Sequence, residues 1–364
     1  MALSESASDR QAPRFLAYVK DKESHEAVTE VTEEMMLPYA EVRHGTPNDA
    51  AKAVDRRGSP RVLLVDVDDS EVPLSDVESV LEVCEPAVQV IVIGRSTSLG
   101  LFRELMRLGV TDYLVKPVTK DLVQRAVHVA TTGEDPEHGR ARTGRVVAVM
   151  GVRGGVGAST IAANVGWTLA SVQRRRVVLV DMDMHTGSLG IMLNVRSGHA
   201  LRNALEAPDQ ITQEQLERSV TRVSDRFYLL DSEEPIGEPI EFDAEGTDTL
   251  IDTLSQLFHF VIVDLPHSPD PVHQHIQQNA QVRVLVAEPT VLAARDVMRR
   301  VAQLTHETSG HRLYLILNHR WKASGSDVAP DAFHKTANKV VDFELPYGKA
   351  SVAAAINAGE PLAQ

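Results

Sequence analysis

The stretch GVRGGVGAST, residues 151–160, brings together several glycines and two hydroxyl side chains. Glycine lets a loop turn its backbone N–H groups inward in conformations that a side chain would block, and such groups bind phosphate oxygens. The candidate residues for a bound polyphosphate are Gly154, Gly155, Val156, Gly157, Ala158, Ser159 and Thr160. Ser159 stands where a hydroxyl would also ligate Mg2+.

One residue departs from the usual form of such a loop. The pattern G-x-x-x-x-G-K-[ST] requires lysine before the hydroxyl residue, but this chain has Ala158 there and places a cation, Arg153, at the start of the loop. Losing a charge-assisted contact costs roughly 1.5 to 3 kcal/mol, which weakens phosphate binding without abolishing it. The alternatives are an ordinary tight turn, or a loop that no longer holds a nucleotide.

Carboxylates follow two further apolar runs. Asp181 and Asp183 come directly after residues 177–180, and Asp264 ends the run that begins at Phe260. Open α/β sheets bind ligands at the carboxyl ends of their strands. We therefore expect Asp264 to hold Mg2+ and Asp181 to support Mg2+ or the loop. The alternative for the pair at 181 and 183 is a cap on the following helix.

These motifs, in this order, resemble the MinD/ParA class of P-loop proteins, which implies ATP and Mg2+ as ligands and a homodimer as the assembly. In that class the early cation crosses to the partner's nucleotide, which would be the role of Arg153, and the second acid of the pair places the attacking water, which would be that of Asp183. The class reads adenine with an asparagine after a late strand, which points to Asn318. Proteins of this class end in a closing segment that packs over the adenine, and the resemblance places that segment at residues 344–363.

More narrowly, GGVGAST resembles the CpaE/TadZ branch, which assembles Tad (Flp-type) pili. The first part of the chain resembles a response-regulator receiver domain, with Asp66 at the phosphoacceptor position and Lys116 before a proline. Lys20 replaces one Mg2+-binding acid and is expected to pair with Asp66, and Gly94 replaces the usual hydroxyl. We expect an unphosphorylated domain that docks partners; the alternative is a phosphorylated one that uses oxygens of Asp68 and Asp69.

Short apolar runs alternate with helical patterns, which predicts an α/β chain with two doubly wound parallel-sheet domains. The expected strands are 15–19, 62–66, 88–94 and 112–115 in the first domain and 145–150, 177–180, 227–230, 260–264, 282–287 and 313–317 in the second. The predicted divisions are a flexible N-terminus at 1–14, a receiver-like domain at 15–130, a linker at 131–144 and an ATP-binding domain at 145–364. The linker is rich in Gly and charged residues.

The composition limits which binding partners and which cellular compartment we expect. The formal charge of −14 disfavours binding to nucleic acid, because such binding rests on neutralising phosphates. The single cysteine, Cys84, fits a reducing compartment. No apolar run approaches ~20 residues and no Lys or Arg follows Lys349, so we expect a cytoplasmic protein that meets a membrane only through partners.

Two stretches give weaker signals. His267, His273 and His275 lack accompanying cysteines, so surface histidines are favoured over a zinc site. Residues 199–249 suggest a helix through Leu216 and Val223 and then an acidic surface loop at 231–248, to which no chemistry is assigned.

The resemblance implies a dimerising localisation and assembly factor of a pilus secretion machine, recruited by its proteins to a cell pole or inner-membrane assembly. Because Ala158 removes a cation from the β/γ-phosphates, it would be at most a slow Mg2+-dependent ATPase. The alternatives are an active ATPase for intracellular positioning or partitioning, and a regulator gated by phosphorylation of Asp66.

Overall fold

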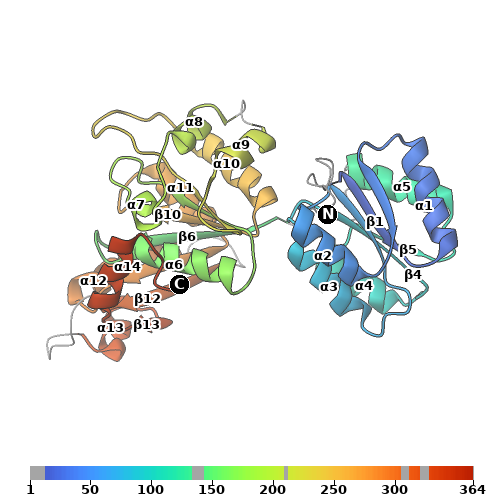
Figure 1. Ribbon diagram of the computed structural model, residues 1–364. Helices are drawn as coiled ribbons and strands as arrows, with labels where there is room; N and C mark the ends of the chain where they lie inside the picture. The colour runs from blue at the N-terminus through green and yellow to red at the C-terminus, as the bar shows by residue number, and fades with distance from the viewer. Residues whose placement is uncertain (1–12, 133–142, 209–211, 305–310, 320–327, 364) are drawn as a thin grey trace, which may run out of the picture. The chain divides into compact units, whose positions relative to one another are not determined.

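A computed structural model describes residues 13–132, 143–208, 212–304, 311–319 and 328–363 of the chain. The chain divides into two compact units, Met1–Thr143 and Gly144–Gln364, which we describe separately (Figure 1). Most of the predicted linker, residues 133–142, lies outside the described residues, and its first two residues belong to helix α5.

The first unit is built on a five-stranded parallel sheet with the order β2-β1-β3-β4-β5. This order is that of the flavodoxin-like doubly wound fold. The strands are β1 (Phe15–Val19), β2 (Ala40–His44), β3 (Val62–Asp66), β4 (Gln89–Gly94) and β5 (Asp112–Val115). The strand β2 was not predicted, because it is an edge strand of exposed and half-buried residues with charges at Glu41 and Arg43.

Helices cover both faces of this sheet because successive strand residues point to opposite faces and both sets are apolar. The helices are α1 (Lys22–Glu34), α2 (Pro47–Arg57), α3 (Pro73–Val83), α4 (Leu99–Leu108) and α5 (Lys120–Thr132). Buried residues of α2, α3 and α4 form one core with the sheet, and those of α1 and α5 form a second core on its other face (Figure 1).

The second unit is built on an eight-stranded sheet with the order β13-β12-β11-β6-β10-β7-β9-β8. The strands are β6 (Arg145–Gly151), β7 (Val177–Asp181), β8 (Thr221–Arg222), β9 (Phe227–Leu230), β10 (Phe260–Leu265), β11 (Val282–Ala287), β12 (Arg312–Asn318) and β13 (Phe343–Leu345). All the pairings are parallel except that of β8 with β9, so the sheet is mixed. The predicted class, two doubly wound α/β domains, is confirmed.

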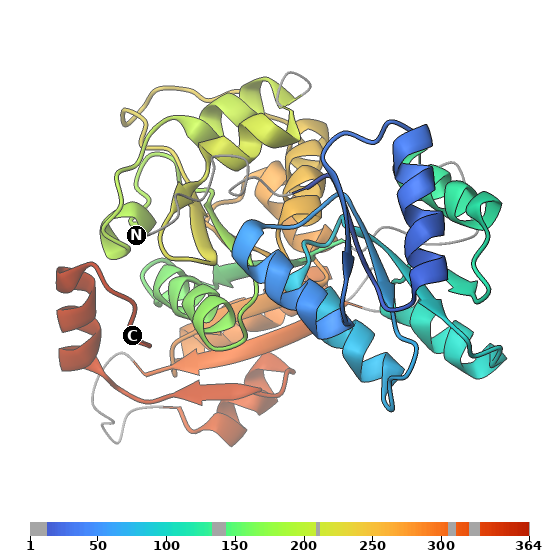
Figure 2. The ribbon, with the colours of Figure 1, turned by 45° about the vertical axis from the view of Figure 1, so that its right-hand side comes forward.

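Helices again cover both faces of the sheet. They are α6 (Ala158–Ser171), α7 (Leu189–Met192), α8 (Ala200–Glu206), α9 (Gln213–Ser219), α10 (Ala244–Leu257), α11 (Pro271–Asn279), α12 (Val291–Leu304), α13 (Pro330–Ala337) and α14 (Lys349–Ala358). Residues of α6 and α7 pack on one face, where Figure 2 shows α6 in front of the strands, and those of α8 to α13 pack on the other.

The stretch before α10 differs from the prediction. The helix α9 ends at Ser219, and the next residues turn into strand β8 instead of continuing a helix to Val223. The predicted surface loop is also wrong in part, because Asp231 and Glu234 are buried and α10 begins at Ala244. The cause is tertiary: Glu234 is buried with Arg202 as its ion-pair partner at 2.9 Å. No helix in the described residues has the length and apolar character needed to cross a membrane.

Candidate functional site

The glycine loop joins β6 to α6 and has the geometry of an anion cradle. Gly155 and Gly157 have φ values of +73° and +94°, a region that other residues rarely adopt. A Cβ added at Gly157 would also lie 2.7 Å from Asn318 Nδ2. The helix α6 begins at Ala158, and no side chain caps its N-terminus. The first N–H groups of α6 and its helix dipole therefore favour an anion in front of the loop.

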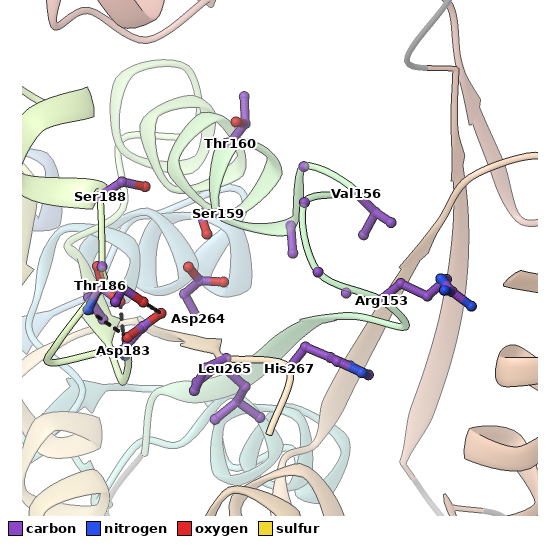
Figure 3. A pocket seen from close by; sticks show the side chains of 18 of the residues that line it. Arg153, Val156, Ser159, Thr160, Asp183, Thr186, Ser188, Asp264, Leu265 and His267 are labelled. Carbon is purple, nitrogen blue, oxygen red and sulfur yellow. Dashed lines mark hydrogen bonds between the residues drawn. The ribbon is translucent and has the colours of Figure 1, made fainter. Parts of the chain in front are cut away.

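A cavity of about 350 Å3 lies in front of this loop and collects most of the predicted site residues. It is lined by Arg153, Gly154, Gly155, Val156, Gly157, Ala158, Ser159, Thr160, Asp181, Asp183 and Asp264, among others. Figure 3 shows Ser159, Asp183 and Asp264 around one space, with the loop that carries Val156 and Arg153 beside it. Predicted phosphate-binding and metal-binding residues thus meet in one place.

The sheet order brings the two acidic strand ends together. In the pairing of β10 with β7, Asp264 is the partner of Asp181, and on its other side Asp264 is the partner of Val149 in β6. The two carboxylates are 5% and 4% exposed. Burial raises the pKa of Asp264 to about 8 and that of Asp181 to about 7, against hydrogen bonds that lower them. Each carboxyl group would keep its charge more readily beside a cation.

Mg2+ fits this donor set when phosphate oxygens complete it. Asp264 Oδ1 is buried and has no hydrogen-bond partner among the described residues, and the Ser159 hydroxyl lies beside it (Figure 3). No three His, Cys, Asp or Glu side chains in the described chain are arranged to hold a metal by themselves. Mg2+ is commonly held by one or two carboxylates together with substrate phosphates and water. Ser159 and Asp264, supported by Asp181, would supply the protein's part.

The side chain of Asp183 stabilises the turn that follows it in the chain. Its two carboxylate oxygens accept hydrogen bonds from Thr186, one from the backbone N–H at 2.9 Å and one from the hydroxyl at 2.7 Å. The alternative of a helix cap is observed in part: Asp183 bonds only within residues 183–187, but Asp181 Oδ2 accepts a hydrogen bond of 3.4 Å from the backbone N–H of Leu189, the first residue of α7. Thr186 also lines the cavity, and sequence reasoning missed it.

A second cavity, of about 740 Å3, lies on the other side of the loop. Its walls include Asn318 from the end of β12, Tyr347, and apolar residues of α14. The Asn318 side-chain amide donates to the backbone oxygen of Val156 at 2.8 Å, which fixes its orientation and leaves Oδ1 as the atom to meet a base. Residues of the predicted closing segment, 344–363, line this cavity.

Arg153 points away from the carboxylates of the cavity (Figure 3). Its Nη1 forms an ion pair of 2.9 Å with Asp296 Oδ2 on α12, and the two side chains are 41% and 26% exposed. The partner could not be read from the sequence, because Asp296 lies 143 residues from Arg153. The contact holds the cation at the rim of the cavity, outside its own phosphate site.

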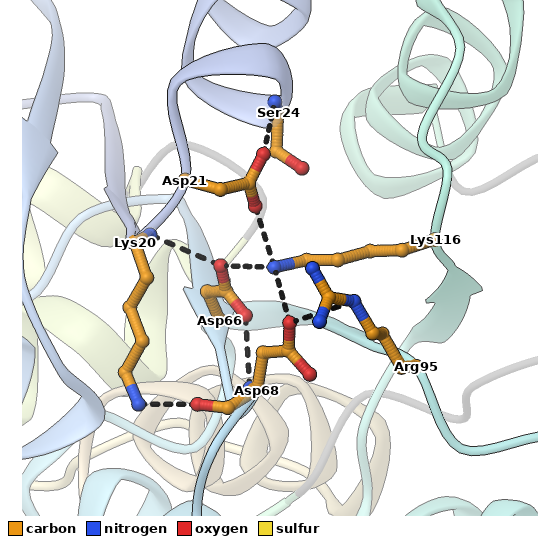
Figure 4. Close-up of polar contacts among 7 residues, drawn as sticks. All are labelled: Lys20, Asp21, Ser24, Asp66, Asp68, Arg95 and Lys116. Atoms are coloured by element: carbon orange, nitrogen blue, oxygen red, sulfur yellow. Dashed lines mark hydrogen bonds and ion pairs between the residues drawn. The ribbon is translucent and has the colours of Figure 1, made fainter.

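The first unit has its own cluster of charges, centred on Lys116 (Figure 4). The Lys116 ammonium contacts Asp21, Asp66 and Asp68 at 2.6, 2.7 and 3.2 Å. Burial lowers the pKa of Lys116, but its hydrogen bonds to Asp21 and Asp66 outweigh this effect and raise it. The expected pairing of Lys20 with Asp66 is wrong for the side chain: the backbone N–H of Lys20 bonds Asp66, and its ammonium bonds the Asp68 carbonyl oxygen.

Replacing Lys116 with methionine should destabilise the first unit. Asp66 is fully buried, so the variant leaves a buried carboxylate without its cation, a change that costs about 3 kcal/mol or more. Hydrogen exchange of residues 13–132 in the full chain would show faster exchange in this variant. Lys120→Met, which removes an exposed ion pair with Glu34, should change the rate of hydrogen exchange little. Equal protection in the two variants would contradict the importance of the cluster.

The three histidines do not behave alike. His273 is 8% exposed and lies against Phe242, so the prediction of a surface histidine is wrong for this residue. Burial lowers its pKa. His275 Nε2 donates to the Asp248 carboxylate at 2.8 Å, and His267 is exposed at the rim of the loop cavity. They form no metal site among the described residues.

A glycine loop between a parallel strand and a helix, with carboxylates at the tips of neighbouring strands, defines a P-loop NTPase domain. Residues 142–321 match the ParA family model, described as NUBPL iron-transfer P-loop NTPase. The second unit thus has the loop and the strand-end acids of a P-loop NTPase domain, and it resembles the MinD/ParA family over residues 142–321.

Individual proteins are similar to parts of this chain. The septum site-determining protein MinD of Synechocystis is 26% identical over 174 residues, which make up 48% of this chain and 64% of that protein, less than two thirds of its length. The structure of MinD with Mg-ADP from Pyrococcus horikoshii has the same fold, with a TM-score of 0.51 and 22% identity over 60% of this chain and 87% of that one. The pilus assembly protein CpaE of Caulobacter crescentus is 28% identical over 32% of this chain and 94% of that one, with a TM-score of 0.30.

The raised carboxyl pKa values predict how stability changes with pH. A carboxyl pKa that is higher in the folded than in the unfolded chain means that the folded state binds more protons, so the free energy of unfolding falls as pH rises from about 4 to about 8. Asp264→Asn removes this loss, roughly 1 kcal/mol per pH unit. Without nucleotide and in EDTA, the variant should match the wild type near pH 4 and exceed it near pH 8.

Urea unfolding followed by the fluorescence of Trp167 in α6 would measure this difference. Asp252→Asn, at an exposed position of α10, is the matched control and should keep the wild-type dependence on pH. Parallel pH profiles for all three proteins would refute the assigned pKa of Asp264.

Proposed function

We propose that this protein is an ATP-binding, dimerising localisation and assembly factor of a Tad/Flp-type pilus secretion system, with slow or no ATP hydrolysis. One observation carries the nucleotide part of the proposal. The polar cavity with the carboxylates and the larger cavity with Asn318 share the loop residues Gly155, Gly157 and Thr160 in their walls. One ATP molecule would therefore place its triphosphate on one side of the loop and its adenine on the other.

Slow hydrolysis follows from the charges around the phosphate cavity. No lysine is present among the described residues that line it, and Arg153 is held at the rim by Asp296. In the proposed role, Asp183 places the attacking water, and its bonds to Thr186 orient it. Without a lysine of the same chain near the β/γ-phosphates, the developing negative charge is less well offset. This favours a slow enzyme over an actively cycling partition ATPase.

The face of α12 supports a homodimer. Val291, Leu292 and Met298 are 65%, 57% and 44% exposed, and Asp296 on the same helix holds Arg153. Apolar side chains exposed together beside a nucleotide site suit an interface. A second copy that covers this face would bring each Arg153 to the nucleotide of the other copy.

The pilus part of the proposal rests on the GGVGAST resemblance and on the receiver-like unit ahead of the loop. With Lys116 already bonded to three carboxylates, Asp66 is a poor phosphoacceptor, so this unit would dock proteins of the secretion machinery unmodified. Docking would draw the protein from the cytoplasm to a cell pole or inner-membrane assembly. Genes for a pilin, a prepilin peptidase and a secretion ATPase next to this one would support it, and their absence would count against it.

Calorimetry with Mg-ATP, Mg-ADP and Mg-GTP tests the nucleotide site directly. We expect heat with both adenine nucleotides, weaker binding of GTP, and a dimer by light scattering only with ATP. No heat with any nucleotide at millimolar concentration would overturn the proposal. Acetyl phosphate and Mg2+ should leave Asp66 unlabelled, and stable labelling would favour a phosphorylation-gated regulator.

A further inference from the structure

We propose that His267 is a second phosphate-contacting side chain that each copy supplies, together with Arg153, to the nucleotide of the other copy. The inference rests on the proposed ATP-dependent homodimer and assigns a residue that neither the motif nor the resemblance singled out as a ligand. It depends on the charge of the loop cavity, on the position of His267 and on the direction of its side chain.

The loop cavity has more acids than bases. Asp181, Asp183 and Asp264 line it, and among its described lining residues only Arg153 and His267 can carry a positive charge. Ala158 supplies none. One Mg2+ offsets part of the charge of a triphosphate and these acids, so further donors are needed for the terminal phosphates. The chain's own candidates are the two side chains at the rim.

His267 is placed beside the start of the loop by strand register. Leu265 is the partner of Met150 in the pairing of β10 with β6, so the residues that follow each strand, Pro266-His267 and the start of the loop, leave the sheet side by side. His267 is exposed, and its ring makes no hydrogen bond or ion pair with any described residue. Its donor is thus available to a ligand from outside its own chain.

The direction of the side chain favours the other copy's nucleotide. Figure 3 shows His267 and Arg153 leaving the cavity on the same side, away from Asp183 and Asp264. A side chain so directed reaches phosphates in its own cavity only after it turns around. If a second copy packs on this rim, the imidazole N–H and the guanidinium enter the facing cavity together, and both can donate to phosphate oxygens.

The test separates a contact to the other copy from one within the same copy. His267→Ala should raise the dissociation constant of the Mg-ATP dimer at least tenfold, measured by sedimentation velocity. It should leave the nucleotide affinity of the monomer within twofold, measured with a fluorescent ATP analogue at protein concentrations below dimerisation. His334→Ala, at an exposed histidine of α13, is the matched control and should change neither value.

The outcomes distinguish this inference from the proposed function. A wild-type chain that does not bind ATP or dimerise overturns both. A wild-type dimer that His267→Ala leaves unchanged overturns only the role of His267. Weaker nucleotide binding by the variant monomer would place the contact within one copy, and this result would also refute the contact of His267 with the other copy. If the alanine variant is misfolded by circular dichroism, His267→Gln decides, because its amide keeps a donor but no charge and should weaken the dimer less than tenfold yet measurably.

Discussion

Ala158→Lys is expected to raise the rate of ATP hydrolysis on the order of 10²-fold or more. Ala158 is half-buried in the wall of the loop cavity, at the first residue of α6. A lysine there would place its ammonium among the phosphates, where negative charge grows during transfer. The same contact should tighten ATP binding by roughly 1.5 to 3 kcal/mol, since it adds a charge-assisted hydrogen bond.

Phosphate release in the presence of Mg2+ measures the rate, and calorimetry measures the affinity. Ala354→Lys adds the same charge at an exposed position of α14 and should leave both unchanged. An Ala158→Lys rate equal to that of the wild type would mean that another group, and not the missing cation, limits hydrolysis.

Arg153→Ala is expected to weaken the Mg-ATP dimer by about 100-fold, because each of the two nucleotides loses a charge-assisted contact from the other copy. Sedimentation velocity at several protein concentrations would measure the change. Arg218→Ala removes an exposed arginine of α9 that pairs with Glu214, and it should have no effect. If the variant and the wild type had equal dimer dissociation constants, Arg153 would not contribute to the interface.

Asp296→Asn should strengthen the Mg-ATP dimer, the opposite of the effect of Arg153→Ala, and by a smaller factor. In the isolated chain the ion pair with Asp296 competes with the partner's phosphates for Arg153, so breaking it favours the dimer. Since both side chains are partly exposed, each pair is worth about 0 to 1 kcal/mol. A dimer breaks two such pairs, so the gain should not exceed about 30-fold. A weaker dimer would show instead that Asp296 contributes to the interface itself.

Most of the strands and the phosphate loop could be predicted because their signals are local. Runs such as FLAYV at β1 and VVLV in β7 are short, continuous and apolar, which is typical of strands buried on both faces. The glycines at 155 and 157 follow from steric rules that involve only neighbouring atoms. The strands β8 and β13 were missed because they have two and three residues and partly exposed side chains.

The sequence by itself determined which residues could bind phosphate and metal, namely the glycine loop, Ser159 and the acids that end β7 and β10. Only the tertiary structure decided which of them meet. Asp264 lies opposite Asp181 because β10 inserts between β6 and β7, an order that no local pattern contains. The partner of Arg153 on α12, the direction of His267, and the use of Lys116 to neutralise Asp66 depend on the packing of segments far apart in the chain. Such contacts are set by long-range packing, whereas spacing along a sequence reports only on neighbours.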